Sequence, residues 1–495
     1  MKNMASGPNF YSILGLPRSA TQEEIRHAYL QSAKKLHPDT NVAAGETEIF
    51  LDVQQAYQVL SDPQRRASYD ATLPPEVEEK IDSPVNASVL ISRKQIPSGG
   101  ETQLLYILLE FSQANAEEDN GTPPLNICLA LDTSTSMKGV NLDVVKATAA
   151  QLLRRMRPQD IFSVISFNDR AEVIVVASRQ LNLHRAENKV QMLLASGGTE
   201  ILRGLESALD EVRRYSGKGM VNHVILLTDG RTYGDEQACY NLAQQAAQDG
   251  IGISGLGIGS NWNDVFLDQL ATLTGGNSMY VSHPQDIERL LNEKFSHLSH
   301  SFAENVLLHL EETPKAQINY AFRLQPEVGP LAIGAEMQVG PILHNTPLSV
   351  ILEMQIFGAK SDGEVLDLLR GRVEIISALL PPPVPEITLK VVISAQRDTH
   401  TETPPQSLVQ ALSKLTLYRI QEKARAAVKQ GEYAKAAQNL QRLATHLLGQ
   451  GEQALAHTIL LEVENIEKNQ SFTESGEKQI KYGTRALLLP SGGRK

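Results

Sequence analysis

The stretch LNICLALDTSTS, residues 125–136, decides the fold of the largest part of the chain. It opens on an almost continuous apolar run, which is typical of a strand buried on both faces of a sheet. Similar short runs stand at residues 161–167, 173–176, 224–227 and 251–258, mostly with helix-length amphipathic segments between them. This alternation predicts a Rossmann-like α/β domain over residues 124–298, doubly wound around a largely parallel sheet. Its ligand site is expected beyond the carboxyl ends of the strands.

Side chains with oxygen atoms stand in three loops of this domain. They are Asp132, Ser134 and Ser136 after the first strand, Thr199 after a Ser-Gly-Gly turn, and Asp229 after the strand at 224–227. Either strand-end motif alone is also common as a helix N-cap cluster or a turn. Together they offer only hard oxygen donors at one end of a sheet, and such donors suit Mg²⁺ or a similar divalent cation.

These residues resemble the von Willebrand factor A family, and the resemblance covers residues 124–298. The five oxygen-bearing residues correspond, one by one, to the metal-ion-dependent adhesion site of that family. The resemblance implies that an acidic side chain of a protein partner completes the metal shell. The neighbouring Gly197 and Gly198 would let the Thr199 loop approach closely.

Two other patterns in the same domain have a plainer interpretation. The segment 255–259, Gly-Leu-Gly-Ile-Gly, does not have the spacing of a dinucleotide-binding motif and is interpreted as close packing at a strand end. His223, at the start of a buried strand, is interpreted as a structural histidine. Because neither a nucleophile–histidine set nor a P-loop is apparent, the chain is predicted not to be an enzyme.

The N-terminal region is helical in pattern and contains the tripeptide His37-Pro38-Asp39. Thr21 and Glu24 form a capping box at the start of a helix. Pro38 disfavours helical geometry at His37, so the helix ends there and a second helix from about Thr47 completes a hairpin with a polar loop at its tip.

This hairpin resembles the J-domain family over residues 9–71, through YSILG at 11–15, the tripeptide and AYQVLSDP at 56–63. The resemblance implies that His37, Pro38 and Asp39 contact a DnaK-class chaperone and stimulate its ATP hydrolysis. The basic residues of the preceding helix that would face that chaperone are Arg26, Lys34 and Lys35. Leu30 and Gln31 stand where an Arg and a Lys are common, which implies a weaker or a specialised chaperone contact.

The remaining segments predict a β-sandwich and a helical end. Strand-like runs at 85–111 are too few for independent stability, so they are expected to join the runs between 306 and 393 in one sandwich. The predicted organisation is a J-domain at 1–73, a linker at 74–84, first sandwich strands at 85–123, the A domain at 124–298, the rest of the sandwich at 305–397, a helical region at 405–467 and a tail at 468–495. The helical region resembles a tetratricopeptide repeat in pattern, although a plain helical bundle is the simpler interpretation.

The composition limits which classes of partner and which cellular compartment are expected. The 495 residues carry a formal net charge of −11, which gives little reason to expect a nucleic-acid partner. The chain has no apolar run long enough for a membrane span and no signal-peptide pattern at its N-terminus. With only two cysteines it has no disulfide framework, so the cytoplasm is expected.

The favoured hypothesis is a co-chaperone adaptor that recruits a DnaK-class chaperone and holds a protein partner at the metal site. One alternative is a non-catalytic A-domain subunit of an AAA-type ATPase assembly. Another is a structural interaction protein.

Overall fold

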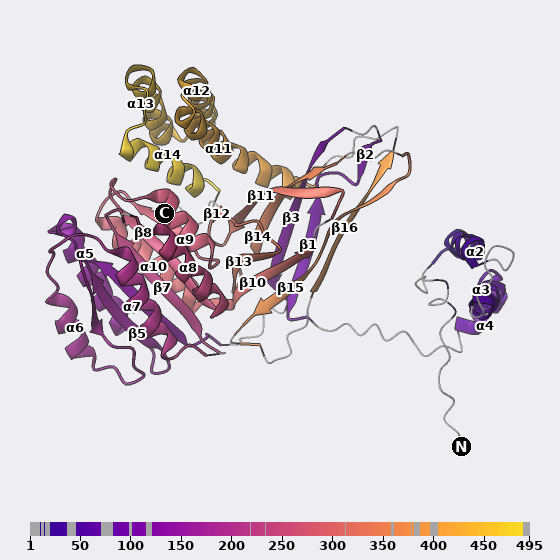
Figure 1. Cartoon of the computed structure of the whole chain (residues 1–495), viewed down its shortest axis with the longest axis horizontal. Helices are drawn as coiled ribbons and strands as arrows, with labels where there is room; N and C mark the ends of the chain where they lie inside the picture. The colour runs from indigo at the N-terminus through magenta and orange to yellow at the C-terminus, as the bar shows by residue number, and fades with distance from the viewer. Residues whose placement is uncertain are drawn as a thin grey trace. The chain divides into compact units, whose positions relative to one another are not determined.

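The computed structural model describes residues 10, 14, 20–36, 46–70, 83–98, 101–114, 121–217, 219–232, 234–311, 313–357, 361–377, 379–380, 387–396 and 404–488. The chain divides into two units, Met1–Asp82 and Ser83–Lys495 (Figure 1). No helix in the described part of the chain is long and apolar enough to cross a bilayer.

The first unit is a small helical domain. The described residues of this unit include helices α2 (Gln22–Leu36), α3 (Glu46–Leu60) and α4 (Pro63–Asp70). Thr21 and Glu24 form the predicted capping box, because the Thr21 backbone N–H donates to Glu24 Oε2 at 2.6 Å and the Glu24 N–H donates back to Thr21 Oγ1 at 3.3 Å. The helices close on a small core of Leu14, Ala20, Ile25, Val53, Ala56 and Leu60.

A six-stranded sheet forms the centre of the second unit's α/β domain. Its order is β6-β5-β4-β7-β8-β9, and every neighbouring pair is parallel except β5 with β6. The strands are β4 (Leu125–Asp132), β5 (Ile161–Phe167), β6 (Ala171–Val175), β7 (Val221–Thr228), β8 (Ile251–Ile258) and β9 (Ser278–Val281). Continuous burial along β4, β5 and β7 agrees with their apolar sequences.

Helices cover both faces of this sheet. One apolar cluster joins the sheet to α5 (Val140–Arg154), α6 (Leu183–Gln191) and α10 (Gln285–Ser299). A second cluster, on the other face, joins it to α7 (Ile201–Arg213), α8 (Glu236–Gln248) and α9 (Asp264–Thr272). The domain is therefore doubly wound, as the sequence predicts.

Two five-stranded sheets pack as a sandwich beside the α/β domain (Figure 1). One sheet contains β1 (Val85–Ile91), β3 (Gln103–Gln113), β14 (Leu348–Ile356), β11 (Ala316–Gln325) and β12 (Gly329–Pro330). The other contains β13 (Glu336–Leu343), β10 (Ser301–Glu311), β15 (Val365–Ile376), β16 (Ile387–Gln396) and β2 (Gln95–Pro97).

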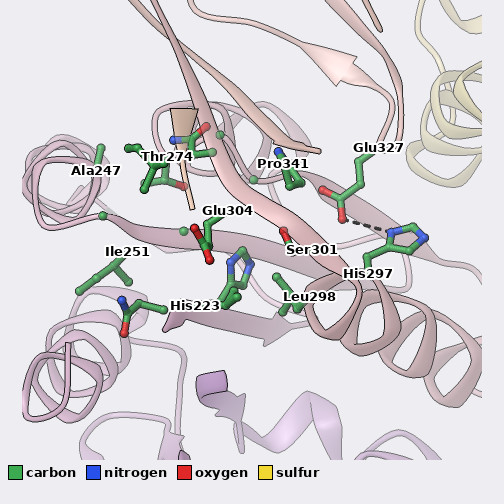
Figure 2. Close-up of a pocket in the computed structure, with 18 of the residues that line it drawn as sticks. His223, Ala247, Ile251, Thr274, His297, Leu298, Ser301, Glu304, Glu327 and Pro341 are labelled. Atoms are coloured by element: carbon green, nitrogen blue, oxygen red, sulfur yellow. Dashed lines mark hydrogen bonds and ion pairs between the residues drawn. The ribbon is translucent and has the colours of Figure 1, made fainter. Parts of the chain in front are cut away.

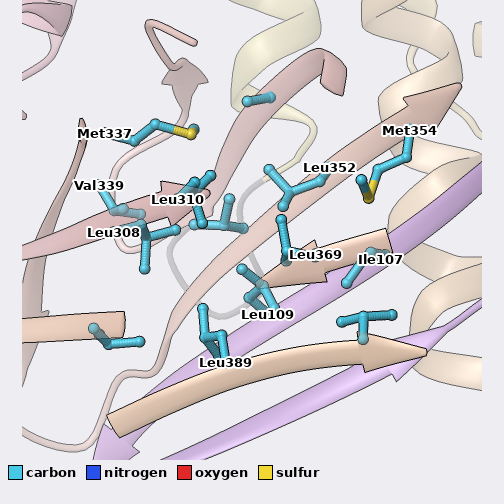
Figure 3. Close-up of a cluster of buried hydrophobic side chains, with 14 of the residues drawn as sticks. Ile107, Leu109, Leu308, Leu310, Met337, Val339, Leu352, Met354, Leu369 and Leu389 are labelled. Atoms are coloured by element: carbon cyan, nitrogen blue, oxygen red, sulfur yellow. The ribbon is translucent and has the colours of Figure 1, made fainter. Parts of the chain in front are cut away.

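Strands from both sides of the α/β domain share the sandwich core. β3 pairs with β14 in antiparallel register, with Phe111 opposite Leu348. Figure 3 shows Ile107 and Leu352 of the first sheet among the side chains that meet Leu308 and Leu389 of the second. The predicted fold class, with the α/β domain inserted in a β-sandwich, is confirmed.

The structure adds strands that the sequence patterns did not indicate, notably β11 and β13. β11 carries Arg323, a charged residue that interrupts its apolar pattern, and β13 contains Gly340 and Pro341. Arg323 is nevertheless buried, because it donates to the carbonyl oxygens of Gly275, Gly276, Glu327 and Val339. A buried charge with all these acceptors is tolerated in a strand.

The C-terminal region contains α11 (Gln406–Lys429), α12 (Tyr433–Gly449), α13 (Gln453–Asn469) and α14 (Glu474–Ala486). The turns before α12 and α13 are alike, since Gly431 and Gly451 have φ values of +77° and +83°, which favour glycine. α11, α12 and α13 pack in sequence around a common apolar core.

The segment 468–495, which the sequence patterns leave as a tail, contains helix α14. Its Lys478, Lys481 and Arg485 are buried, whereas a segment rich in Lys and Arg is expected to be solvated. Lys481 and Arg485 pair with Asp264 and Asp268 of α9. These partners lie more than 200 residues away in the sequence and offset the cost of burying the charges. Residues 474–486 therefore form a docked helix where the sequence patterns indicate only a tail.

Candidate metal centre

The candidate site forms where β4 and β7 end. Asp132 is the last residue of β4, and Asp229 directly follows β7. The two strands are parallel neighbours, with Leu131 opposite Leu227, so both carboxylates emerge at the same edge of the sheet. Ser134 and Ser136 stand in the short turn between β4 and α5.

Hydrogen bonds bring four of the five predicted residues together. Ser136 Oγ donates to Asp229 Oδ1 at 2.6 Å, and Ser134 Oγ lies 3.0 Å from Ser136 Oγ and 3.5 Å from Asp229 Oδ1. Asp132 Oδ1 accepts from the Ser134 backbone N–H at 2.8 Å. Two hydroxyls and a carboxylate oxygen thus converge on one point beside the buried Asp132 carboxyl.

Thr199 reaches the same place from a separate loop. The loop is fixed by the Thr135 backbone N–H, which donates to the Gly197 carbonyl at 3.1 Å, and by the Gly198 N–H, which donates to Asp169 Oδ1 at 2.8 Å. A Cβ on Gly230 would lie only 2.6 Å from Thr199 Oγ1. Glycine at 230 therefore permits the contact between the Thr199 loop and the end of β7.

Both carboxyl groups of the site are short of positive charge. Burial raises the pKa of Asp132 to about 6, although hydrogen bonds from Ser134 and Thr228 oppose the shift. Burial also raises the pKa of Asp229 above its usual range, against the hydrogen bond from Ser136. No cation from the described residues is paired with either carboxyl. The ionised pair would be stabilised by an external cation.

The site opens into a surface cavity of about 420 Å³. Its lining residues are Ser136, Gly198, Thr199, Asp229, Gly230, Arg231, Asn261 and Glu474. The donor set fits a hard divalent cation, because it consists of carboxylates and hydroxyls. It contains only two carboxylates, so it is not a cluster of three or more His, Cys, Asp or Glu side chains, and no such cluster occurs in the described part of the chain. Two carboxylates neutralise a divalent cation without saturating its coordination shell.

Several residues of the site were not assigned from the sequence. Thr228 donates to Asp132 Oδ2 at 2.6 Å and Asp169 holds the Thr199 loop. Thr228 is the last residue of β7 and belongs to a Thr-Asp-Gly motif visible in the sequence, and Asp169 follows β5. A position at or just after the end of a strand was therefore the available signal for both. Arg231, Asn261 and Glu474 line the cavity, and Glu474 comes from the segment interpreted as a tail.

A second cavity lies near the opposite, amino-terminal ends of β7 and β8, between the α/β domain and the sandwich (Figure 2). Its volume of about 50 Å³ has room for only a few water molecules. Figure 2 shows His223 and the Glu327–His297 pair among its lining residues, and Lys294 Nζ lies 2.6 Å from Glu327 Oε1. Burial acts to raise the pKa of Glu327, but the Lys294 ammonium holds it well below its usual range.

His223 itself packs as part of the domain core. Its Nε2 lies 2.9 Å from Ser254 Oγ, and burial lowers its pKa well below the usual range. A Cβ at Gly252 would lie 2.4 Å from His223 Nδ1, so the ring depends on glycine there. These contacts agree with its interpretation as a structural histidine.

Most of the predicted chaperone-contact residues fall outside the described part of the chain. His37, Pro38 and Asp39 are outside it, as are the side chains of Lys34 and Lys35. Arg26 is exposed on α2, one residue after the buried Ile25. The described helices thus place one of the predicted basic residues on the outer face of α2.

Comparison with known families agrees with this architecture. Residues 9–70 match the DnaJ domain, residues 126–293 match the von Willebrand factor type A domain, and residues 406–490 match the Sll0103-like, C-terminal alpha-helical domain. The chain is a fusion of a J domain, a von Willebrand factor A domain and that helical domain. The third match begins at the start of α11 and includes α14.

Individual relatives resemble different parts of the chain. An uncharacterized protein, sll0103, of Synechocystis sp. is 26% identical over 423 residues, which cover 82% of this chain and 98% of that protein. Chaperone protein DnaJ of Erysipelothrix rhusiopathiae is 55% identical over 67 residues, which cover 14% of this chain and 18% of that protein. The chain thus spans less than a fifth of that chaperone's length.

A solved structure shares the fold of the larger unit. It is a von Willebrand factor type A protein from Catenulispora acidiphila, with a TM-score of 0.63 and 15% sequence identity. The likeness covers 81% of this chain and 96% of that one.

Proposed function

We propose that this protein is a J-domain co-chaperone adaptor. The J domain recruits a DnaK-class chaperone and stimulates its ATP hydrolysis, while the A domain holds a protein partner through a divalent cation, Mg²⁺ or a similar ion. J domains and A domains are generally non-catalytic, and the proposed role is binding, with ATP hydrolysed by the chaperone. Both cysteines, Cys128 and Cys239, are buried free thiols, which fits a reducing compartment such as the cytoplasm.

The observation that carries the proposal is the convergence of oxygen donors in an open cavity. Asp132, Ser134, Ser136, Thr199 and Asp229 would hold the cation. When bound, the cation supplies a Lewis-acidic position for an oxygen ligand from outside the chain. The cavity is open to solvent, so the carboxylate of an acidic side chain on a partner can reach that position.

The chain's own groups prepare the site for this binding. Thr228 and the Ser134 backbone N–H orient the Asp132 carboxylate through its two oxygens. Ser134 and Ser136 present their hydroxyls beside Asp229, and Asp169 fixes the loop that carries Thr199. This preorganisation reduces the ordering cost of cation binding.

The two halves of the proposal are tested separately on the full chain. Stimulation of a DnaK-class ATPase is measured with wild type, with Asp39→Asn, and with Glu23→Gln as a matched carboxylate-to-amide control on the exposed face of α2. We expect Asp39→Asn to abolish stimulation and Glu23→Gln to leave it unchanged. Equal stimulation by wild type and Asp39→Asn would exclude the co-chaperone role.

Cation binding is measured by titration calorimetry with Mg²⁺ on wild type, Ser134→Ala and Asp229→Ala. We expect Asp229→Ala to abolish Mg²⁺ binding. Ser134→Ala should weaken it roughly tenfold, because it removes one ligand contact whose strength is about that of a hydrogen bond. Unchanged Mg²⁺ affinity in Asp229→Ala would exclude the site. The protein is also used to capture binding partners in the presence of Mg²⁺. If it retains an AAA-type ATPase and no chaperone client, the hypothesis of a non-catalytic subunit of an ATPase assembly replaces the adaptor hypothesis.

A further inference from the structure

The cavity beside the candidate metal centre is shared by two domains. Thr199, Asp229 and Ser136 of the A domain line one part of it, and Glu474, the first residue of α14, lines another. Arg231 connects the two parts, because its Nη2 donates to Glu474 Oε1 at 3.0 Å. Arg231 and Glu474 lie 243 residues apart in the sequence, so this wall of the cavity is formed only when α14 is docked.

Helix α14 is docked firmly enough to form a wall. Lys481 Nζ lies 2.7 Å from Asp268 Oδ2, and Arg485 Nη1 donates to Asp268 Oδ1 at 2.8 Å. Near the cavity, Lys478 Nζ donates to the Ser260 carbonyl and lies 5.3 Å from the centre of the Trp262 ring. These contacts hold the loop that carries Asn261 against the first turns of α14.

Arg231 is positioned on this wall with capacity for another acceptor. Its Nε donates to the Asn261 carbonyl at 2.8 Å, and a second N–H is used by Glu474. A guanidinium has five N–H donors, so two are engaged by these contacts. The Arg231 side chain is 46% exposed, which leaves the other donors within reach of a ligand in the cavity.

We propose that α14 forms part of the partner-binding face of the metal centre, with Arg231 as a second attachment point for an acidic partner segment. The inference rests on the proposed function, since one carboxylate of the segment binds the cation. A second carboxylate of the same segment pairs with Arg231. Glu474 and the Asn261 carbonyl position the guanidinium, and Glu474 competes for it in the free protein.

This arrangement selects a partner with at least two acidic side chains close together. The cation and Arg231 supply two positive centres in one cavity, so a single carboxylate satisfies only one of them. Arginine pairs with carboxylates through parallel N–H groups, which adds directional preference to the attraction. The chemistry therefore favours acidic protein segments over isolated acidic residues.

The test uses the full chain and two labelled peptides of equal length. In one, four aspartates alternate with glycines, and in the other three of these aspartates are asparagines. Binding is measured by fluorescence anisotropy in Mg²⁺ and in chelator, for wild type, Arg231→Gln, Glu474→Gln and Asp229→Ala. Arg203→Gln is the matched control, because Arg203 is an exposed arginine of α7 paired with Glu206.

The substitutions Arg231→Gln and Glu474→Gln are expected to change peptide affinity in opposite directions. Arg231→Gln weakens binding of the four-aspartate peptide roughly two- to fivefold and leaves binding of the one-aspartate peptide unchanged, as expected for a partly exposed charge pair. Glu474→Gln strengthens the four-aspartate peptide about two- to threefold, because the amide still accepts from Arg231 but no longer repels the peptide carboxylate. Arg203→Gln changes neither.

Failure of this inference is distinct from failure of the metal site. If Arg231→Gln behaves as Arg203→Gln does, or Glu474→Gln gives no gain, α14 is not part of the binding face. If instead chelator and Asp229→Ala leave both peptides bound as in wild type, the proposed metal-dependent function itself is wrong. Circular dichroism of Arg231→Gln and Glu474→Gln confirms that the docked fold is retained.

Discussion

Two pairs of aspartates in the A domain differ in whether cations of the chain itself neutralise their charge. Asp132 and Asp229 lie at the end of β4 and after β7, and burial raises the pKa of both. Asp264 and Asp268 lie on α9, where burial also acts to raise their pKa values. In that second pair, nearby cations outweigh burial and lower the pKa of both carboxyl groups below their usual range.

The difference lies in what the chain itself supplies. Lys481 contacts both Asp264 and Asp268, Arg425 pairs with Asp264 at 2.9 Å, and Arg485 pairs with Asp268. No described residue provides such a cation to Asp132 or Asp229. Burial acts in the same direction in both places, and the source of positive charge separates the two pairs. Cations of the chain fasten α14 to the domain through Asp264 and Asp268, whereas we propose that Asp132 and Asp229 take a cation from solution.

The largest expected effect comes from breaking the internally neutralised pair. Asp268→Ala leaves Arg485 and Lys481, whose side chains are only 5% and 4% exposed, with one carboxylate fewer. We expect the free energy of unfolding to fall by about 3–5 kcal/mol, the cost of removing one partner of a buried ion pair. Urea unfolding followed through Trp262, the single tryptophan, measures it.

The control for this variant is Asp210→Ala, whose carboxyl is 75% exposed and only 3.9 Å from Arg213. It should change the free energy of unfolding by less than about 0.5 kcal/mol. A loss below about 1 kcal/mol in Asp268→Ala would show that the α9–α14 ion pairs do not stabilise docking.

A smaller effect is expected from supplying the missing charge to the other pair. Mg²⁺ at about 100 times its dissociation constant should raise the free energy of unfolding of wild type by about 2.7 kcal/mol. Asp229→Ala should abolish this increase, whereas Asp268→Ala should retain it from a lower starting value. Thermal unfolding with and without Mg²⁺ measures it, and an equal Mg²⁺ effect in wild type and Asp229→Ala would remove the distinction between the two pairs.

The smallest effect is expected from pH, at the α14 interface. Because the folded pKa values of Asp264 and Asp268 are lowered, their contribution to stability is complete above the unfolded value of about 3.9 and is lost as pH falls through the folded values. Trp262 fluorescence should therefore stay constant from pH 8 to about pH 5 and change only below about pH 4. A transition near pH 6 that persists in Asp132→Asn, which removes the carboxyl whose pKa burial raises to about 6, would contradict the ion-pair account.

Sequence patterns predicted much of the fold because their causes are local. The apolar run at 125–131 reports burial on both faces of a sheet, and the capping box of Thr21 and Glu24 reports a helix start within one turn. The oxygen donors of the candidate site could be selected because each follows a strand or opens a loop. Thr228 and Asp169 were missed because their role is to support another residue, which the motif does not reveal.

Other features depend on partners that are distant in the sequence. The strand β11 was not predicted, because Arg323 breaks its apolar pattern and its acceptors are carbonyls of other elements. Helix α14 was not predicted for the same reason. In the sequence its charged residues are typical of a solvated tail. Only the positions of Asp264 and Asp268 show that these charges are paired and buried.

The sequence by itself determined the order of the domains, the doubly wound sheet and the oxygen donors at its carboxyl edge, because hydrophobic period and strand-end motifs are properties of neighbouring residues. Only the tertiary structure decided which aspartates receive a cation from the chain. Lys481 lies 217 residues from Asp264, Arg485 lies 217 residues from Asp268, and Glu474 lies 243 residues from Arg231. Charge compensation depends on distance in space, so no local pattern could separate the pair that fastens α14 from the pair that faces the cavity.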